Sequence, residues 1–119
     1  MATQRVSVTG PRLSLQITER EGARVVHCSG RLAVDNTDLL KTEVRKLIPG
    51  AQCIVLDLTD LTYMDSSGLG TLVGLYVSCK TAHCSLELIN LSKWVRELLG
   101  LTNVLAVFQK CGEHMINFR

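Results

Sequence analysis

The sequence has little of what a nucleic-acid-binding or membrane-spanning protein needs. Aromatic residues make up only 4% of the 119 residues, and the net charge is +2, with 13 basic residues against 11 acidic ones. Such a chain offers few base-stacking side chains and no strongly basic surface, so we expect no nucleic-acid partner. Its longest stretch without a charged residue, Ser66 to Cys79, has 14 residues and three glycines. A membrane-spanning helix needs about 20 apolar residues, so we expect no membrane insertion.

From the first residues and the cysteines of the sequence, we expect neither a secretion signal nor disulfides. The first residues, which include Arg5, contain no apolar stretch of the kind found in signal peptides. The five cysteines are odd in number, and Cys28 and Cys53 lie within apolar runs, so we expect a cytoplasmic protein with reduced thiols. Since no Cys-x-x-Cys spacing occurs, we expect no metal, and we also expect no cofactor. The alternative is a metal site with ligands from Cys79, His83, Cys84, Cys111 and His114.

What the sequence does contain is typical of a folded globular domain, with 46% hydrophobic and 20% charged residues. No linker, low-complexity segment or repeat interrupts it, so we expect one domain over residues 1–119. Alternating apolar residues predict a strand at 13–17, and a second strand at 25–28 follows a polar turn and ends at Gly30. These two strands are expected to form a hairpin.

The rest of the chain alternates helices and strands. The pattern predicts a helix that begins after the cap-type residues 35–37 and stops at Pro49-Gly50, then a buried strand at 53–58 and a polar turn. A second helix is predicted over 66–80, followed by a strand at 86–89 and a third helix capped by Asn90 or Ser92. The last predicted elements are a strand at 104–108 and a short helix within 109–119. Alternation of this kind predicts a small α/β domain with a mixed, mainly parallel sheet and helices packed on it.

The most informative segment runs from Asp57 to Gly70 and contains Asp65-Ser66-Ser67-Gly68-Leu69. It leads from a buried strand to the start of a helix, where Asp65 or Ser66 is the N-cap. That helix end has N–H donors without partners and a partial positive charge. Gly68 and Gly70 each cost about 1 kcal/mol of helix propensity relative to Ala. Their bare backbone would let another molecule approach the Ser66 hydroxyl.

Local chemistry leaves several interpretations of this segment open. Plain helix capping is the simplest of them. A nucleophilic serine would be expected in a Gly-x-Ser-x-Gly elbow, which is absent, and His27, His83 and His114 are scattered along the chain. A phosphate-binding loop would end in Gly-Lys-Ser/Thr or follow Gly-x-Gly-x-x-Gly, and neither pattern occurs.

The run from Asp57 to Leu72 resembles the signature of the STAS family, specifically of bacterial anti-sigma factor antagonists. Similar segments at Gly30-Arg31-Leu32, 86–91 and 98–101 extend the resemblance over most of the chain. It implies a STAS-like fold without enzymatic activity. It also implies a partner, an anti-sigma factor that is a serine kinase, whose capture by this chain releases a sigma factor.

The resemblance further implies a switch at Ser66, the first serine of the motif, which the kinase phosphorylates and a metal-dependent phosphatase restores. The implied partner-binding residues are Arg31, Asp35, Asp65, Ser66, Ser67, Gly68 and Leu69. A phosphate adds a charge of about −1.5 to −2 beside Asp65, which would oppose binding. Many relatives have an acid after Gly-x-Leu, whereas this chain has Ala33, with Asp35 two positions later. The alternative function is a STAS scaffold that is not phosphorylated, or a module linked to a transporter.

Overall fold

The strands of the protein form one sheet, whose order follows the sequence. The computed structural model describes residues 5–20, 22–93, 95–97 and 116–117. Its elements are β1 (Arg5–Gly10), β2 (Leu13–Arg20), β3 (Ala23–Leu32), α1 (Thr37–Leu47), β4 (Cys53–Met64), α2 (Ser66–Thr81), β5 (Ser85–Ile89) and β6 (Ile116–Asn117). The sheet order is β1-β2-β3-β4-β5-β6. The first three strands pair antiparallel and β3 to β6 pair parallel, so the predicted mixed, mainly parallel α/β fold is confirmed.

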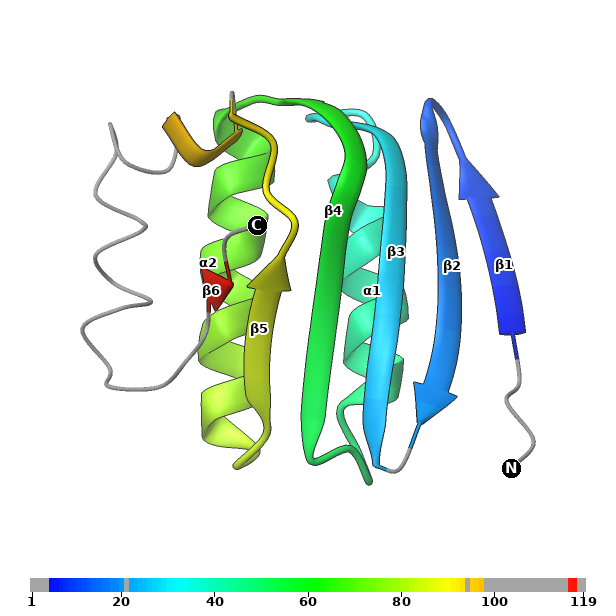
Figure 1. The fold of residues 1–119 in the computed structure, drawn as a ribbon, viewed down its shortest axis with the longest axis vertical. Coiled ribbons are helices and arrows are strands. Elements are labelled where there is room, and N and C mark those ends of the chain that lie inside the picture. The colour runs from blue at the N-terminus through cyan, green and yellow to red at the C-terminus, as the bar shows by residue number, and fades with distance from the viewer. Residues whose placement is uncertain (1–4, 21, 94, 98–115, 118–119) are drawn as a thin grey trace.

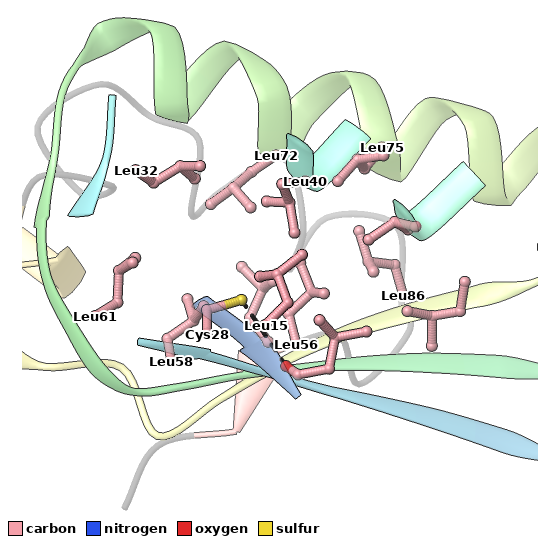
Figure 2. Packing of buried hydrophobic residues seen from close by; sticks show 14 of the residues in the cluster. Leu15, Cys28, Leu32, Leu40, Leu56, Leu58, Leu61, Leu72, Leu75 and Leu86 are labelled. Carbon is pink, nitrogen blue, oxygen red and sulfur yellow. Dashed lines mark hydrogen bonds between the residues drawn. The ribbon is translucent and has the colours of Figure 1, made fainter. Parts of the chain in front are cut away.

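Both described helices lie on the same face of the sheet, where they pack against each other (Figure 1). Apolar side chains from alternate strand positions fill the space between helices and sheet, and Figure 2 shows Leu15 and Leu56 of the sheet below Leu72 and Leu75 of α2. The largest fully buried side chains are Leu15, Leu32, Leu40, Ile54, Leu56, Leu58, Leu61, Met64, Leu72, Leu75 and Leu86. This core fixes the strand ends from which the candidate site is built.

β4 contains two residues more than β3 over the segment in which the two strands pair. Ala23 pairs with Cys53 and Leu32 pairs with Met64, and the register shifts between His27 and Ser29 and again between Gly30 and Arg31. Each shift is a bulge, which bends the strand. The polar turn predicted after residue 58 is therefore wrong: residues 59–64 remain paired with β3. The bulges space the buried side chains Leu58, Leu61 and Met64 three residues apart, and a period of two cannot detect that pattern.

The structure differs from the predicted elements in three further places. The second predicted strand does not end at Gly30, because β3 continues to Leu32. Gly30 has φ 110°, and a Cβ there would collide with the carbonyl oxygen of Arg12. β1 was not predicted, and its pairing with β2 makes it a strand. Ile116–Asn117 is a strand, where a short helix was expected. Residues 98–115, which include the predicted strand at 104–108, lie outside the described residues.

The prediction of a third helix is supported at its beginning. Ser92, rather than Asn90, is the cap: its Oγ accepts a hydrogen bond from the Val95 N–H at 3.1 Å, and its carbonyl accepts from the Arg96 N–H at 2.9 Å. Within the described ranges, no helix is long and apolar enough to cross a membrane.

Candidate functional site

Asp65 fixes the start of α2 through both of its carboxylate oxygens. Oδ1 accepts a hydrogen bond from the Gly68 N–H at 3.0 Å, and Oδ2 accepts one from the Val34 N–H at 3.0 Å, in the loop between β3 and α1. The backbone N–H of Asp65 donates to the Leu32 carbonyl at 3.2 Å. Asp65 is therefore the N-cap of α2, and it also ties this helix to the neighbouring loop.

The hydroxyl of Ser66 lies at the first position of α2, on an exposed residue. Ser67 is half-buried, and its carbonyl accepts a hydrogen bond from the Thr71 hydroxyl at 2.8 Å. Leu69 is buried and belongs to the core. Of the predicted partner-binding residues in this segment, Ser66 is thus the most accessible from solvent, and it lies beside the N–H donors of the helix end.

The two glycines of the first helical turn face different surroundings. A Cβ at Gly68 would lie 2.6 Å from the Met64 Cγ and 2.7 Å from the Leu32 carbonyl oxygen, so the helix can approach β3 only because this residue has no side chain. A Cβ at Gly70 would meet nothing within 4 Å. The bare backbone that the sequence suggested for an approaching molecule is therefore at Gly70, whereas Gly68 is buried against the protein itself.

The loop between β3 and α1 lies against the start of α2, and hydrogen bonds of the Asn36 side chain hold it in place. This residue is only 3% exposed. Its Nδ2 donates to the carbonyl oxygens of Pro11 and Arg31 at 2.7 and 3.0 Å, and its Oδ1 accepts from the Ala33 N–H at 3.0 Å. Asn36 makes no side-chain cap bond to α1. The capping role predicted for the Asn36 side chain is therefore wrong, and no local pattern in the sequence indicates its role in shaping the loop.

The same loop exposes the predicted residue Asp35 and its neighbour Val34 to solvent, whereas Ala33 is buried. Ala33, at the position where the resemblance leads us to expect an acid, is only 8% exposed. Asp35 is exposed, and Val34 is 75% exposed although its backbone is bound to Asp65. The structure therefore brings the Asp35 loop and the Ser66 helix start together, as two adjoining parts of one surface.

Arg31 lies at the end of β3, opposite the end of β4. Its guanidinium is 4.7 Å from the ring centroid of Tyr63, the residue with which it pairs in the sheet. A cation over an aromatic face is an attractive arrangement. Tyr63 is 38% exposed and was not among the predicted site residues; its position two residues before Asp65 was the signal that could have indicated it.

Two acidic residues upstream of Ser66 are engaged elsewhere. Asp57 accepts hydrogen bonds from the Thr59 N–H and the Asn90 Nδ2, each at 3.1 Å, and Asp60 Oδ2 lies 2.8 Å from His27 Nε2. Burial would raise the pKa of Asp57, but the hydrogen bonds from Thr59, Asn90 and His27 outweigh it and hold the pKa below its usual value. These carboxylates are bound within the sheet.

The part of the chain that the structure describes contains no group of three His, Cys, Asp or Glu side chains that could hold a metal ion. Cys79 and Cys84 are buried free cysteines, and burial raises the pKa of Cys79 to about 12. Cys111 and His114 lie outside the described residues.

Comparison with known proteins identifies the family. The sequence profile of the STAS domain matches residues 14–116, which is most of the 119 residues. The chain therefore belongs to the STAS domain family.

Similar proteins include antagonists of anti-sigma factors. The anti-sigma F factor antagonist of Paenibacillus polymyxa is 28% identical over 97 residues, covering 80% of this chain and 83% of that protein. The fold resembles that of the anti-sigma factor antagonist SpoIIAA in its unphosphorylated form, with a TM-score of 0.72 at 18% identity over 88% of this chain and 87% of that one. It also resembles a sulfate transporter family protein from Wolinella succinogenes, with a TM-score of 0.71 at 18% identity over 83% of this chain and 78% of that one.

Proposed function

We propose that this chain is an anti-sigma factor antagonist that acts as a phosphorylation-controlled binding protein and has no enzymatic activity. In its unphosphorylated state it binds an anti-sigma factor that is also a serine kinase, and a sigma factor is released. The kinase phosphorylates Ser66, and a metal-dependent phosphatase reverses the modification. The proposal includes a cytoplasmic location and a single domain over residues 1–119.

The observation that carries this proposal is the exposed Ser66 hydroxyl at a rigidly held helix start. Asp65 fixes that start to the β3–α1 loop with two hydrogen bonds. A kinase needs an accessible hydroxyl, and a binding partner needs a surface of constant shape. Relatives that are anti-sigma factor antagonists point to the same function.

The exposed side of α2 explains why a phosphate would oppose binding. Ser66, Gly70, Gly74 and Val77 are exposed positions of this helix, and no charged residue occurs from Ser66 to Cys79. A partner that packs on this uncharged surface would have to bury the new charge of about −1.5 to −2. Burying a charge without a partner is costly, and the adjacent Asp65 carboxylate adds repulsion.

The proposal is tested by measuring how strongly the phosphorylated and unphosphorylated forms of this chain bind one anti-sigma kinase. Calorimetry would compare wild type, wild type phosphorylated on Ser66, Ser66→Ala and Ser66→Asp, with Ser7→Ala, at an exposed serine of β1, as the control. We expect Ser66→Asp to bind at least about tenfold more weakly, or about 1.4 kcal/mol, and Ser66→Ala to bind nearly normally and to resist switching. Mass spectrometry should locate the phosphate on Ser66. Equal affinities of the phosphorylated and unphosphorylated chains, or phosphate mainly on Ser67, would contradict the proposal.

The second candidate function is a STAS scaffold that is not phosphorylated, or a module that acts with a transporter. The similarity in fold to the sulfate transporter family protein favours it. It predicts that serine kinases with ATP leave the mass of the Ser66 peptide unchanged.

A further inference from the structure

A histidine on the face of the sheet opposite the described helices lies between two carboxylates. His27, in the middle of β3, has its Nε2 2.8 Å from Asp60 Oδ2 and its Nδ1 3.3 Å from Asp57 Oδ2. The side chains of His27 and Asp57 are 29% and 21% exposed, and that of Asp60 is 60% exposed. Both ring nitrogens therefore face an acceptor.

This arrangement suits only the protonated ring. An imidazolium has two N–H donors, whereas the neutral imidazole has one donor and one lone pair. A neutral ring would turn its lone pair toward one of the two carboxylates. Burial lowers the pKa of His27, but its contacts with Asp60 and Asp57 outweigh burial and raise the pKa above its usual value.

No other charged group competes for this histidine among the described residues. Its partner on β2 is Gln16, and its neighbours on the same side of β3 are Val25 and Ser29. On β4 the charged groups in contact are Asp57 and Asp60, and from the end of β5 the uncharged Asn90 binds Asp57. The charge state of His27 is therefore controlled by these two carboxylates.

The two carboxylates lie on opposite sides of the first bulge of β4. His27 pairs with Asp57, and the next pair is Ser29 with Asp60, so β4 advances three residues where β3 advances two. Beyond this bulge, β4 passes the second bulge, between Leu61 and Tyr63, and ends at Met64, just before Asp65 and the start of α2. The side chain of His27 thus contacts β4 on both sides of its first bulge, which bends the strand on its way to Ser66.

Loss of the proton would remove one of the two N–H donors, and the two carboxylates differ in their other partners. Asp57 keeps hydrogen bonds from Asn90 and from the Thr59 backbone without His27. The side chain of Asp60 makes its hydrogen bond to His27, and it is the carboxylate on the Ser66 side of the bulge. A neutral ring has a single N–H and can donate to only one of the two carboxylates, so the link between the two sides of the bulge would be lost.

We infer that His27 is a proton-dependent clasp across the first bulge of β4, which holds the strand in the position that presents Ser66, so that binding at the Ser66 site weakens as the pH rises. The clasp itself is independent of the partner; its effect on binding rests on the proposed function.

NMR titration of the isotope-labelled full chain tests the clasp without any partner. Between about pH 5 and about pH 9, a range that spans histidine titration, the His27 ring signals and the amide signals of residues 60–66 should shift with the same midpoint. His27→Gln should abolish the amide shifts. His83→Gln is the matched control, since His83 is exposed in the turn after α2, and it should leave them unchanged.

A second variant keeps the inference testable if His27→Gln fails to fold. Asp60→Asn retains the histidine, removes one of the two carboxylates and changes an exposed side chain. The midpoint of the remaining His27 titration should then move to lower pH, because an opposite charge that favours the imidazolium is lost. Amides 60–66 that stay unmoved while His27 titrates, or a midpoint that Asp60→Asn does not lower, would overturn the clasp.

Binding measurements separate the inference from the proposed function. The affinity of the unphosphorylated chain for an anti-sigma kinase should fall several-fold from the acidic to the alkaline end of the titration. His27→Gln should bind weakly at every pH, and His83→Gln should follow the wild type. Equal binding of the phosphorylated and unphosphorylated chains would refute the proposed function and leave the NMR result for the clasp intact. A phosphorylation-dependent affinity that is independent of pH would refute the coupling alone.

Discussion

At the scale of single residues, Gly68 and Gly70, two positions apart in α2, have opposite structural roles. Gly68→Ala forces a Cβ against the Leu32 carbonyl oxygen at 2.7 Å and the Met64 Cγ at 2.6 Å. We expect it to lower the free energy of unfolding by about 1–3 kcal/mol, as overpacking does. Gly70→Ala fills open space and should raise it by about 0.5–1 kcal/mol. Urea unfolding of both variants measures the difference, and similar effects would contradict the distinct roles.

Gly70→Ala also tests the function of the bare backbone. If a partner approaches α2 closely at this turn, the variant should fold more stably than wild type and bind the anti-sigma kinase more weakly. A side chain at Gly70 would then stand in the interface although it touches nothing within the chain. Unchanged affinity would place the contact elsewhere on the surface.

Asn36 is the residue on which the loop beside Ser66 depends most. Three hydrogen bonds join its buried side chain to Pro11, Arg31 and Ala33. Asn36→Ala should cost about 3 kcal/mol of unfolding free energy, at about 1 kcal/mol for each bond. Asp35→Ala, in the exposed neighbouring position, is the control and should change stability by less than about 0.5 kcal/mol. Thermal or urea unfolding gives both values, and equal values would contradict this assignment.

At the scale of elements, Asp65 joins α2 to the β3–α1 loop. Asp65→Ala removes the N-cap bond to Gly68 and the bond to the Val34 N–H together. We expect a loss of about 1–2 kcal/mol in unfolding free energy, the range for a lost N-cap. Ser92→Ala, which removes the cap bond to Val95 far along the chain, is a matched capping control that should leave binding at Ser66 unaffected. Hydrogen exchange should show faster opening of the first turn of α2 in Asp65→Ala only.

The helices were the elements that the sequence predicted well. The helix predicted over 66–80 is α2 at Ser66–Thr81, and the one after residues 35–37 is α1 at Thr37–Leu47. Caps and a period of 3.6 are local signals, so they can be identified without knowledge of the partner elements. The length of β4 was missed because bulges depend on register with β3, which no local pattern records.

The candidate site shows the same division between local and distant information. The Asp65-Ser66-Ser67-Gly68 motif and its helix start were evident from the sequence, because they lie within four consecutive residues. Asn36 and His27 were not, since Asn36 binds Pro11 25 positions away and His27 binds Asp60 33 positions away. Their roles depend on the folded arrangement of strands that are far apart in the chain.

At the scale of the whole molecule, the shifted pKa values predict how stability depends on pH. The pKa of Asp57 is held below its ordinary value of 3.8, so its contribution is present above pH 3.8 and is lost as the pH falls through the folded pKa. The pKa of His27 is raised above 6.5, so its contribution is complete below pH 6.5 and is lost as the pH rises through the folded pKa. For these two groups, stability is greatest between pH 3.8 and 6.5.

Buried thiols add a second decline at alkaline pH. Burial raises the pKa of Cys28 from 9.0 to about 12. Above pH 9.0 the unfolded chain loses this proton while the folded protein keeps it, so the folded state loses stability between pH 9.0 and about 12. Cys28→Val replaces the thiol by an apolar side chain suited to a strand and should weaken the decline in that range.

Unfolding free energies measured by urea at successive pH values would resolve both declines. The wild type should lose stability in two steps, one that begins near neutral pH and one above pH 9.0. His27→Gln should remove the first step and keep the second, Cys28→Val should keep the first and reduce the second, and His83→Gln should keep both. The variants assign the steps because the two groups act on different states of the chain: protonated His27 stabilises the folded form, whereas ionisation of Cys28 favours the unfolded form. A near-neutral step that persists in His27→Gln would show that other groups control stability there.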